Sequence, residues 1–167
     1  MTEFEVDGLK ITLPDGVVGR KFDNSETHGL SHCMKAVDII IEAKDATIFM
    51  EFKYPDNPGA EEKRRDDYIN NFLSGSIDRN LILKCRDTLL YEIFSGKFEM
   101  PIYYIVLIEG KGLEPKHLLR RTDSLKKNIP LLGPYGNKWK KTLIQECCVM
   151  NVAQWNKKYP NYPITYC

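Results

Sequence analysis

Short apolar runs bounded by polar turns organise the middle of the chain. Residues 37–42 and 47–53 are rich in Ile and Val and are separated by only four residues, which predicts two antiparallel strands. Residues 102–108 are apolar without interruption, which is typical of a strand buried on both faces, as in a parallel pair reached through a helix. Residues 133–138 then predict a loop and residues 143–152 a last strand.

Helical periodicity occupies the segments between these strands. Residues 61–74 are highly charged and predict a surface helix, whereas residues 77–94 predict a core-facing helix because apolar side chains recur at every fourth position. That face comprises Ile77, Leu81, Cys85, Leu89 and Ile93, with Ile82, Leu90 and Phe94 beside them. Residues 113–127 predict a further helix and residues 152–159 a final helical turn. This order predicts an α/β fold, with helices flanking a sheet of mixed direction.

The N-terminal third is more polar. Residues 4–13 predict a hairpin, because Asp7-Gly8 supplies the positive backbone dihedrals of a type I′ turn. Residues 22–32 fit either a short helix capped by Asn24 or Ser25, or only a loop. No repeat, linker or low-complexity segment interrupts the chain, so we expect one domain over all 167 residues.

Composition excludes several classes of protein. The chain is 43% apolar and 28% charged, and its longest apolar run is too short to cross a bilayer, so we expect no membrane partner. The N-terminus is acidic and lacks an apolar signal core, which predicts a cytoplasmic location. Five cysteines without a CxxC pair predict reduced, buried thiols rather than disulfides or a zinc site.

Net charge adds little about a partner, because it is only +1. Nucleic-acid contacts would have to come from local basic clusters, and each cluster also fits a solvated face. The clusters are Lys63-Arg64-Arg65, Arg120-Arg121 with Lys126-Lys127, and Lys138-Trp139-Lys140-Lys141. We expect Trp139 and Trp155 to pack in the core or at an edge rather than to stack on bases.

One pair of carboxylates stands out from the other charges. The chain contains five E-x-K sequences, which begin at Glu42, Glu51, Glu61, Glu109 and Glu114. If the strand hairpin turns at Lys44-Asp45, Asp38 lies directly opposite Glu51. One face of the hairpin then carries only apolar residues, namely Val37, Ile39, Ile41, Ile48, Met50 and Phe52. Asp38, Glu51 and Lys53 share the other face.

This arrangement is suited to metal-assisted chemistry. Two carboxylates about 5 Å apart repel each other unless a cation lies between them. Mg²⁺ typically takes one or two protein carboxylates and keeps several waters, and it can polarise a phosphate and activate an attacking water. Lys53 would orient that water or stabilise the charge of the transition state. A plain ion pair at the strand end is the structural alternative.

The segments VDIIIE and IFMEFK, followed by a helix and a buried strand, resemble the PD-(D/E)XK nuclease superfamily from about residue 26 to residue 152. The resemblance implies a restriction-endonuclease-like fold with Asp38, Glu51 and the backbone carbonyl of Phe52 as metal ligands. It also implies Lys53 as the catalytic lysine and Lys84 as the additional lysine of the following helix.

The same resemblance implies a function and partners. We expect hydrolysis of nucleic acid, with DNA favoured over RNA, in the presence of Mg²⁺ or Mn²⁺, in restriction, repair or defence. A homodimer or a partner subunit fits a nuclease with one such site per chain. The alternative is a catalytically silent module of the same fold that binds nucleic acid or a protein partner.

Two features depart from the superfamily pattern. Val37 stands where many members have proline, and Glu26 is the only candidate for the glutamate that members carry on the first helix. Glu26 also fits a surface or capping role. His28 and His32 lie four residues apart, but no third ligand accompanies them, so we expect no metal there.

Overall fold

A mixed five-stranded sheet forms the centre of the computed structural model, which describes residues 1–97, 99–129, 131 and 142–167. The strands, in the order in which they pair, are β3 (Val18–Lys21), β4 (Ile39–Glu42), β5 (Thr47–Lys53), β6 (Ile102–Ile108) and β7 (Ile144–Met150). The pairs β3/β4 and β4/β5 are antiparallel, and the pairs β5/β6 and β6/β7 are parallel. The predicted α/β class with a mixed sheet is therefore confirmed.

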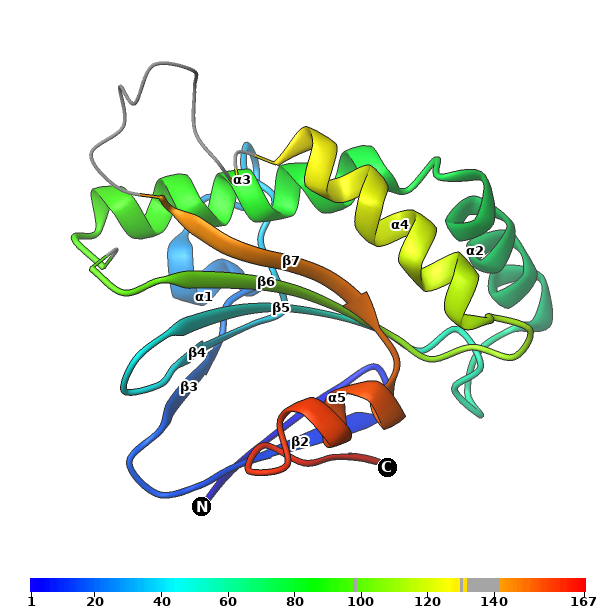
Figure 1. The fold of residues 1–167 in the computed structure, drawn as a ribbon, viewed down its shortest axis with the longest axis horizontal. Coiled ribbons are helices and arrows are strands. Elements are labelled where there is room, and N and C mark those ends of the chain that lie inside the picture. The colour runs from blue at the N-terminus through cyan, green and yellow to red at the C-terminus, as the bar shows by residue number, and fades with distance from the viewer. Residues whose placement is uncertain (98, 130, 132–141) are drawn as a thin grey trace.

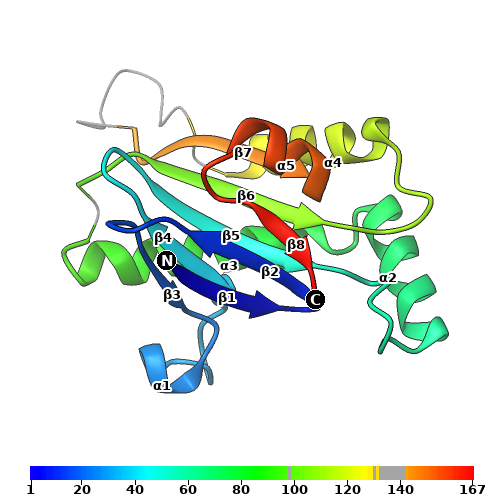
Figure 2. The ribbon, with the colours of Figure 1, turned by 90° about the horizontal axis from the view of Figure 1, so that it is seen from below.

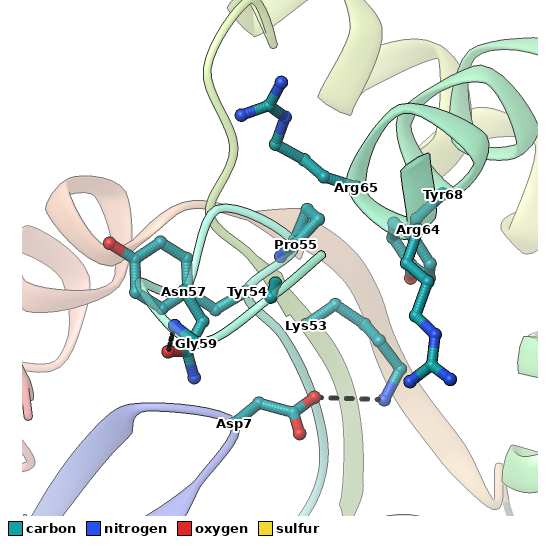
Figure 3. A pocket seen from close by; sticks show the side chains of 10 residues that line it. Asp7, Lys53, Tyr54, Pro55, Asn57, Gly59, Arg64, Arg65 and Tyr68 are labelled. Atoms are coloured by element: carbon teal, nitrogen blue, oxygen red, sulfur yellow. Dashed lines mark hydrogen bonds and ion pairs between the residues drawn. The ribbon is translucent and has the colours of Figure 1, made fainter. Parts of the chain in front are cut away.

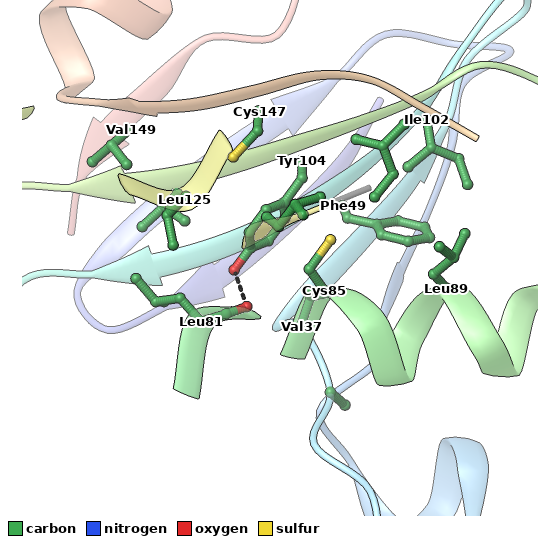
Figure 4. Packing of buried hydrophobic residues seen from close by; sticks show 14 of the residues in the cluster. Val37, Phe49, Leu81, Cys85, Leu89, Ile102, Tyr104, Leu125, Cys147 and Val149 are labelled. Carbon is green, nitrogen blue, oxygen red and sulfur yellow. Dashed lines mark hydrogen bonds between the residues drawn. The ribbon is translucent and has the colours of Figure 1, made fainter. Parts of the chain in front are cut away.

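Helices cover one face of this sheet (Figure 1). They are α2 (Glu62–Ser74), α3 (Asp78–Phe94) and α4 (Pro115–Asn128). Figure 4 shows the core between these helices and the sheet, where Phe49 and Tyr104 from the sheet contact Leu81 and Cys85 from α3. The Tyr104 hydroxyl donates a hydrogen bond to the Leu81 carbonyl at 2.9 Å, so this buried polar group is satisfied.

A smaller sheet covers the opposite face (Figure 2). It consists of β1 (Thr2–Val6), β2 (Leu9–Leu13) and β8 (Ile164–Tyr166), all antiparallel, and α5 (Val152–Lys158) lies beside it. A second core lies between the two sheets, with Ile11 on one side, Met50 on the other, and the fully buried Trp155 closing it. Both faces of β5 are therefore covered.

The register of the β4/β5 hairpin agrees with the prediction. Ile39 pairs with Met50 and Ile41 with Ile48, so Asp38, the residue before β4, faces Glu51. Val37 was predicted on the same face as Ile39, and that prediction is wrong. The strand begins only at Ile39, and Val37 packs with the helix-side core instead.

The predicted N-terminal hairpin is confirmed. Its turn at Asp7-Gly8 has positive φ angles of 51° and 78°. Residues 22–32 contain the short helix α1 (Ser25–His28), and the Asn24 side chain accepts a hydrogen bond from the Glu26 amide. Strands β3 and β8 were not predicted.

The remaining predictions concern single segments. The predicted loop 133–138, Trp139 and the basic cluster 138–141 lie outside the described residues. All five cysteines are free, but Cys33 and Cys167 are exposed rather than buried. Within the described part of the chain, none of the helices combines the length and apolar character that crossing a bilayer requires.

Candidate functional site

The two strands of the β4/β5 hairpin deliver the three predicted charged residues to one location. Alternation along β5 directs Glu51 and Lys53 to the helix side of the sheet, the side of Phe49. Asp38 joins them from the start of the neighbouring strand, and its Oδ2 accepts a hydrogen bond of 2.7 Å from the Phe52 amide. This bond fixes the orientation of the Asp38 carboxylate.

The predicted ligands converge on one point, which the Lys53 ammonium occupies. Lys53 Nζ lies 2.8 Å from Glu51 Oε1 and 3.7 Å from Asp38 Oδ2. It also donates a 2.7 Å hydrogen bond to the Phe52 carbonyl. The two carboxylates and the carbonyl that the resemblance implies as metal ligands thus surround a single positive charge.

Lys84 reaches the same carboxylates from helix α3. Its Nζ donates to Glu51 Oε2 at 2.9 Å and lies 3.5 Å from Asp38 Oδ1. The Lys84 side chain is only 10% exposed, and that of Glu51 is completely buried. The structure therefore brings together all the residues named from the sequence for catalysis and metal binding.

Burial and charge act against each other in this cluster. Burial raises the pKa of Glu51 above its usual value, although Lys53 and Lys84 partly offset the effect. Burial disfavours the charged forms of Lys53 and Lys84, but Glu51 and Asp38 outweigh it, so the pKa of each lysine is raised. Both lysines are accordingly ammonium ions at neutral pH.

Two acidic residues of the site were not predicted from the sequence. Asp7, in the turn of the N-terminal hairpin, lies 3.7 Å from Lys53 Nζ, and Asp23 lies 3.3 Å from Lys84 Nζ. Both come from segments distant in sequence, and no local pattern links either residue to the β4/β5 hairpin. With them, four carboxylates surround two ammonium groups.

The other candidates lie elsewhere. Glu26 is exposed in α1, and no contact with the site is found for its side chain among the described residues. The His28 Nδ1 accepts a hydrogen bond from the Leu30 amide, and His32 is exposed. Trp155 is fully buried, and its indole donates to the Tyr162 carbonyl at 2.6 Å, as expected of a core residue.

Two open pockets give access to the site from different sides. One has a volume of about 360 Å³ and reaches Lys53 (Figure 3). Its walls include Asp7 from the hairpin turn, Tyr54 from the exit of β5, and Arg64 and Tyr68 from α2. The other, of about 500 Å³, reaches Asp38 and is also lined by Asp23 and Lys21.

The donor set fits a hard divalent cation. Asp38, Glu51 and the Phe52 carbonyl offer oxygen atoms only, which Mg²⁺ prefers, and one or two carboxylates are typical of its protein sites. Glu51 Oε1 is fully buried and has no hydrogen-bond partner, although two ammonium nitrogens lie 2.8 Å away. Over the described residues, no cluster of three or more His, Cys, Asp or Glu side chains has the geometry of a metal site. The fit thus depends on the carbonyl as well as on the side chains.

Comparison with known proteins adds no family: no protein-family model, curated protein or solved structure matches the chain.

Proposed function

We propose that this protein is a divalent-metal-dependent nuclease that hydrolyses phosphodiester bonds in nucleic acid, with DNA the favoured substrate. One observation carries the proposal. Carboxylate oxygens of Asp38 and Glu51 and the Phe52 carbonyl all lie within 3.7 Å of the Lys53 ammonium, and Lys53 lines a pocket that opens to solvent. The restriction-endonuclease-like character of the fold and membership of the PD-(D/E)XK superfamily are parts of the same proposal.

Asp38, Glu51 and the Phe52 carbonyl would hold the cation, and Mg²⁺ or Mn²⁺ bound there would polarise the scissile phosphate and activate a water. The Phe52 amide keeps Asp38 oriented, so its carboxylate needs little reorganisation to bind. The Lys84 ammonium donates a hydrogen bond to buried Glu51 and opposes the rise that burial causes in the pKa of this carboxyl.

Lys53 acts through its charge. Its raised pKa keeps it protonated, so it can donate a hydrogen bond to a phosphate oxygen or to the attacking water, and it cannot accept a proton at neutral pH. The side chain is 23% exposed and faces the open pocket, where a phosphate can approach it. Preorganised positive charge of this kind stabilises the charge that develops on phosphate oxygens.

Cleavage assays test this function. Plasmid DNA, single-stranded DNA and RNA are incubated with MgCl₂ or MnCl₂ and with the wild type, Lys53→Met or Lys44→Met. Lys44 is an exposed residue in the turn of the same hairpin, so its variant is the matched control for loss of a lysine. We expect the wild type and Lys44→Met to cut and Lys53→Met to lose at least about 100-fold in rate, as for a removed electrostatic group. Cleavage that survives in Lys53→Met would remove Lys53 from the mechanism.

A silent module is the second candidate, and one observation favours it. Two lysines already pair with Glu51, as in a purely structural ion network. In that case no nucleic acid is cut under any metal condition. Binding of labelled DNA or RNA without cleavage would then support a module that recognises nucleic acid.

A further inference from the structure

One wall of the pocket at Lys53 belongs to helix α2. Arg64 and Tyr68 line this wall, and they lie four residues apart, so both side chains are on the same face of the helix. In Figure 3 they extend from α2 toward Lys53, which comes from β5. Two cationic groups and one hydroxyl therefore line a single cavity of about 360 Å³.

Tyr68 belongs both to the core and to the pocket. Its ring packs against the helix-side core, which fixes the position of the side chain. The buried hydroxyl of Tyr104 on the same side of the sheet donates to the Leu81 carbonyl, whereas the Tyr68 hydroxyl has no hydrogen-bond partner among the described residues. A tyrosine at this position thus leaves a donor available to a group that enters the pocket.

The charges of the site keep this hydroxyl protonated. Burial raises the pKa of Tyr68 far above its usual range, and three carboxylates of the site raise it further. The hydroxyl is therefore a neutral group at neutral pH and can donate a hydrogen bond. In this respect it differs from Lys53 and Arg64, which are also donors but carry a positive charge.

Arg64 has the least compensated charge of the basic residues that line the pocket. Lys53 has three carboxylates within 3.7 Å, and Arg65 pairs with Asp56, whose side chain is only 8% exposed. Arg64 pairs with Glu61 at 3.4 Å, but these two side chains are 82% and 73% exposed, and such a pair contributes little. An anion in the pocket can therefore bind Arg64 without breaking a buried ion pair.

A phosphate group of a nucleic-acid backbone fits this set of donors. The planar guanidinium can bind two phosphate oxygens at once, and an ammonium adds a point charge. Tyrosine hydroxyls are among the neutral donors that proteins use for phosphate oxygens. The pocket volume also lies within the range of ligand sites in proteins.

We propose that Arg64 and Tyr68 form a phosphate-binding subsite on α2, which holds a backbone phosphate of the nucleic acid beside Lys53. This inference rests on the proposed function, because it concerns the substrate of the same site. Tyr68 binds substrate and takes no part in proton transfer. Phosphate contacts position a strand without reading its bases, so the subsite predicts binding that does not depend on base sequence.

Fluorescence anisotropy with a labelled DNA duplex, in the presence of a chelator, tests the subsite without cleavage. The proteins are the wild type, Tyr68→Phe, Tyr91→Phe and Arg64→Ala. Tyr68→Phe retains the ring in the core and removes only the hydroxyl. Tyr91 is the matched control, because it also packs against the helix-side core from a helix but lines neither of the two pockets at the site.

We expect Tyr68→Phe to weaken binding about tenfold, as for a lost hydrogen bond to a charged group. The slope of log affinity against log salt concentration should not change, because a neutral hydroxyl releases no counterion. Arg64→Ala should instead reduce that slope by about one, and Tyr91→Phe should bind as the wild type does.

Two outcomes would overturn the subsite and leave the nuclease proposal to the cleavage assay. Unchanged affinity in Tyr68→Phe would remove the hydroxyl from binding. A slope reduced as in Arg64→Ala would show that Tyr68 only holds the arginine in place. Conversely, the expected effects on binding, together with no cleavage under any metal condition, would support the subsite and overturn the nuclease proposal.

A second substitution guards against an effect on folding. Tyr68→Met also lacks the hydroxyl but differs in shape, so it should show at least the same loss of affinity with the same slope as the wild type. Thermal unfolding of each variant checks that it is folded. Wild-type affinity in Tyr68→Met would contradict the proposal even if Tyr68→Phe did not fold. Absence of duplex binding by the wild type would also overturn the subsite.

Discussion

At the scale of single residues, the most unusual group is Glu51, a carboxylate without solvent exposure that depends on two lysines. Removal of one partner leaves a buried charge that is poorly compensated, and such a loss is strongly destabilising. We expect Lys84→Met to lower the free energy of unfolding at pH 8 by about 3 kcal/mol, the lower end of the range for buried pairs, because Lys53 remains.

This cost should depend on pH in a defined direction. Burial already raises the pKa of Glu51 above its usual 4.5, and loss of Lys84, which lowers this pKa, raises it further. A carboxyl with a raised pKa in the folded state contributes stability that is full below the unfolded pKa and is lost as the pH rises through the folded pKa. The cost of Lys84→Met should therefore shrink as the pH falls from 8 toward 4.5.

Urea unfolding at several pH values measures the effect. In a Glu51→Gln background the buried charge is absent, so Lys84→Met should have a cost that does not vary between pH 8 and pH 4.5. A cost that is constant with pH in the wild-type background would show that Lys84 acts through packing rather than through Glu51.

The central residues of the site can be predicted from the local sequence, but the two outer carboxylates cannot. Asp38, Glu51 and Lys53 can be placed together because strand alternation and the length of one hairpin determine their neighbours. Asp7 and Asp23 reach the site through the packing of one sheet on another and through a loop, and neither is encoded in a short-range pattern. The position of Lys84 came from a family resemblance, since periodicity shows which helix face is apolar and not which strand that face meets.

At the scale of elements, the connection between α2 and α3 leaves no room for a side chain at Gly75. Gly75 ends α2 with a φ of 87°, and a Cβ at this position would lie 1.9 Å from Arg121 Nη1. Arg121 is 5% exposed and pairs with Asp78 at 2.9 Å, so it cannot move without breaking a buried ion pair.

We expect Gly75→Ala to destabilise the protein by about 3 kcal/mol or more, through backbone strain together with the disturbed ion pair. Gly96 is the matched control, because it follows α3 with a φ of 74° and no atom of the described residues lies within 4 Å of the position that a Cβ would take. Its replacement by Ala should cost only about 1 kcal/mol, the strain alone. Equal shifts of both variants in chemical unfolding would remove the Arg121 contact from the explanation.

Elements whose own sequence has a clear hydrophobic pattern were predicted. Strands that are extended only because they pair with a neighbouring strand were not. The continuous apolar run of β6 and the four-residue period of α3 identify both elements. Strand β3, with the sequence VGRK, is extended because it pairs with β4, and Gly19 within it permits close approach of the Phe4 side chain. Leu90 and Phe94 were predicted beside the core face of α3, but they are 49% and 84% exposed. Leu90 and Phe94 lie on the same side of the helix as the exposed Arg86, four and eight residues earlier, whereas Leu89 and Glu92 beside Leu90 are buried.

At the scale of the whole molecule, a net charge of +1 provides no general attraction for a polyanion. The proposed function therefore predicts that nucleic acid is bound by particular side chains near the pocket of Lys53. Of the two predicted basic clusters that lie within the described residues, that on α2 is placed there: Arg64 lines the pocket, and its side chain is 82% exposed. Arg121, from another cluster, is instead buried in its pair with Asp78.

We expect Arg64→Ala to weaken binding of a DNA duplex, and to reduce the slope of log affinity against log salt concentration by about one, the value for one lost phosphate contact. The measurement is fluorescence anisotropy in the presence of a chelator, so that no cleavage occurs. Arg120→Ala is the control, because Arg120 is an exposed arginine of α4 that lines a different pocket. If Arg120→Ala changes the slope as much as Arg64→Ala does, binding is spread over the surface and is not directed to the site. If neither variant changes it, the nucleic acid does not approach Lys53 along α2, and the role of the pocket as the substrate entrance is wrong.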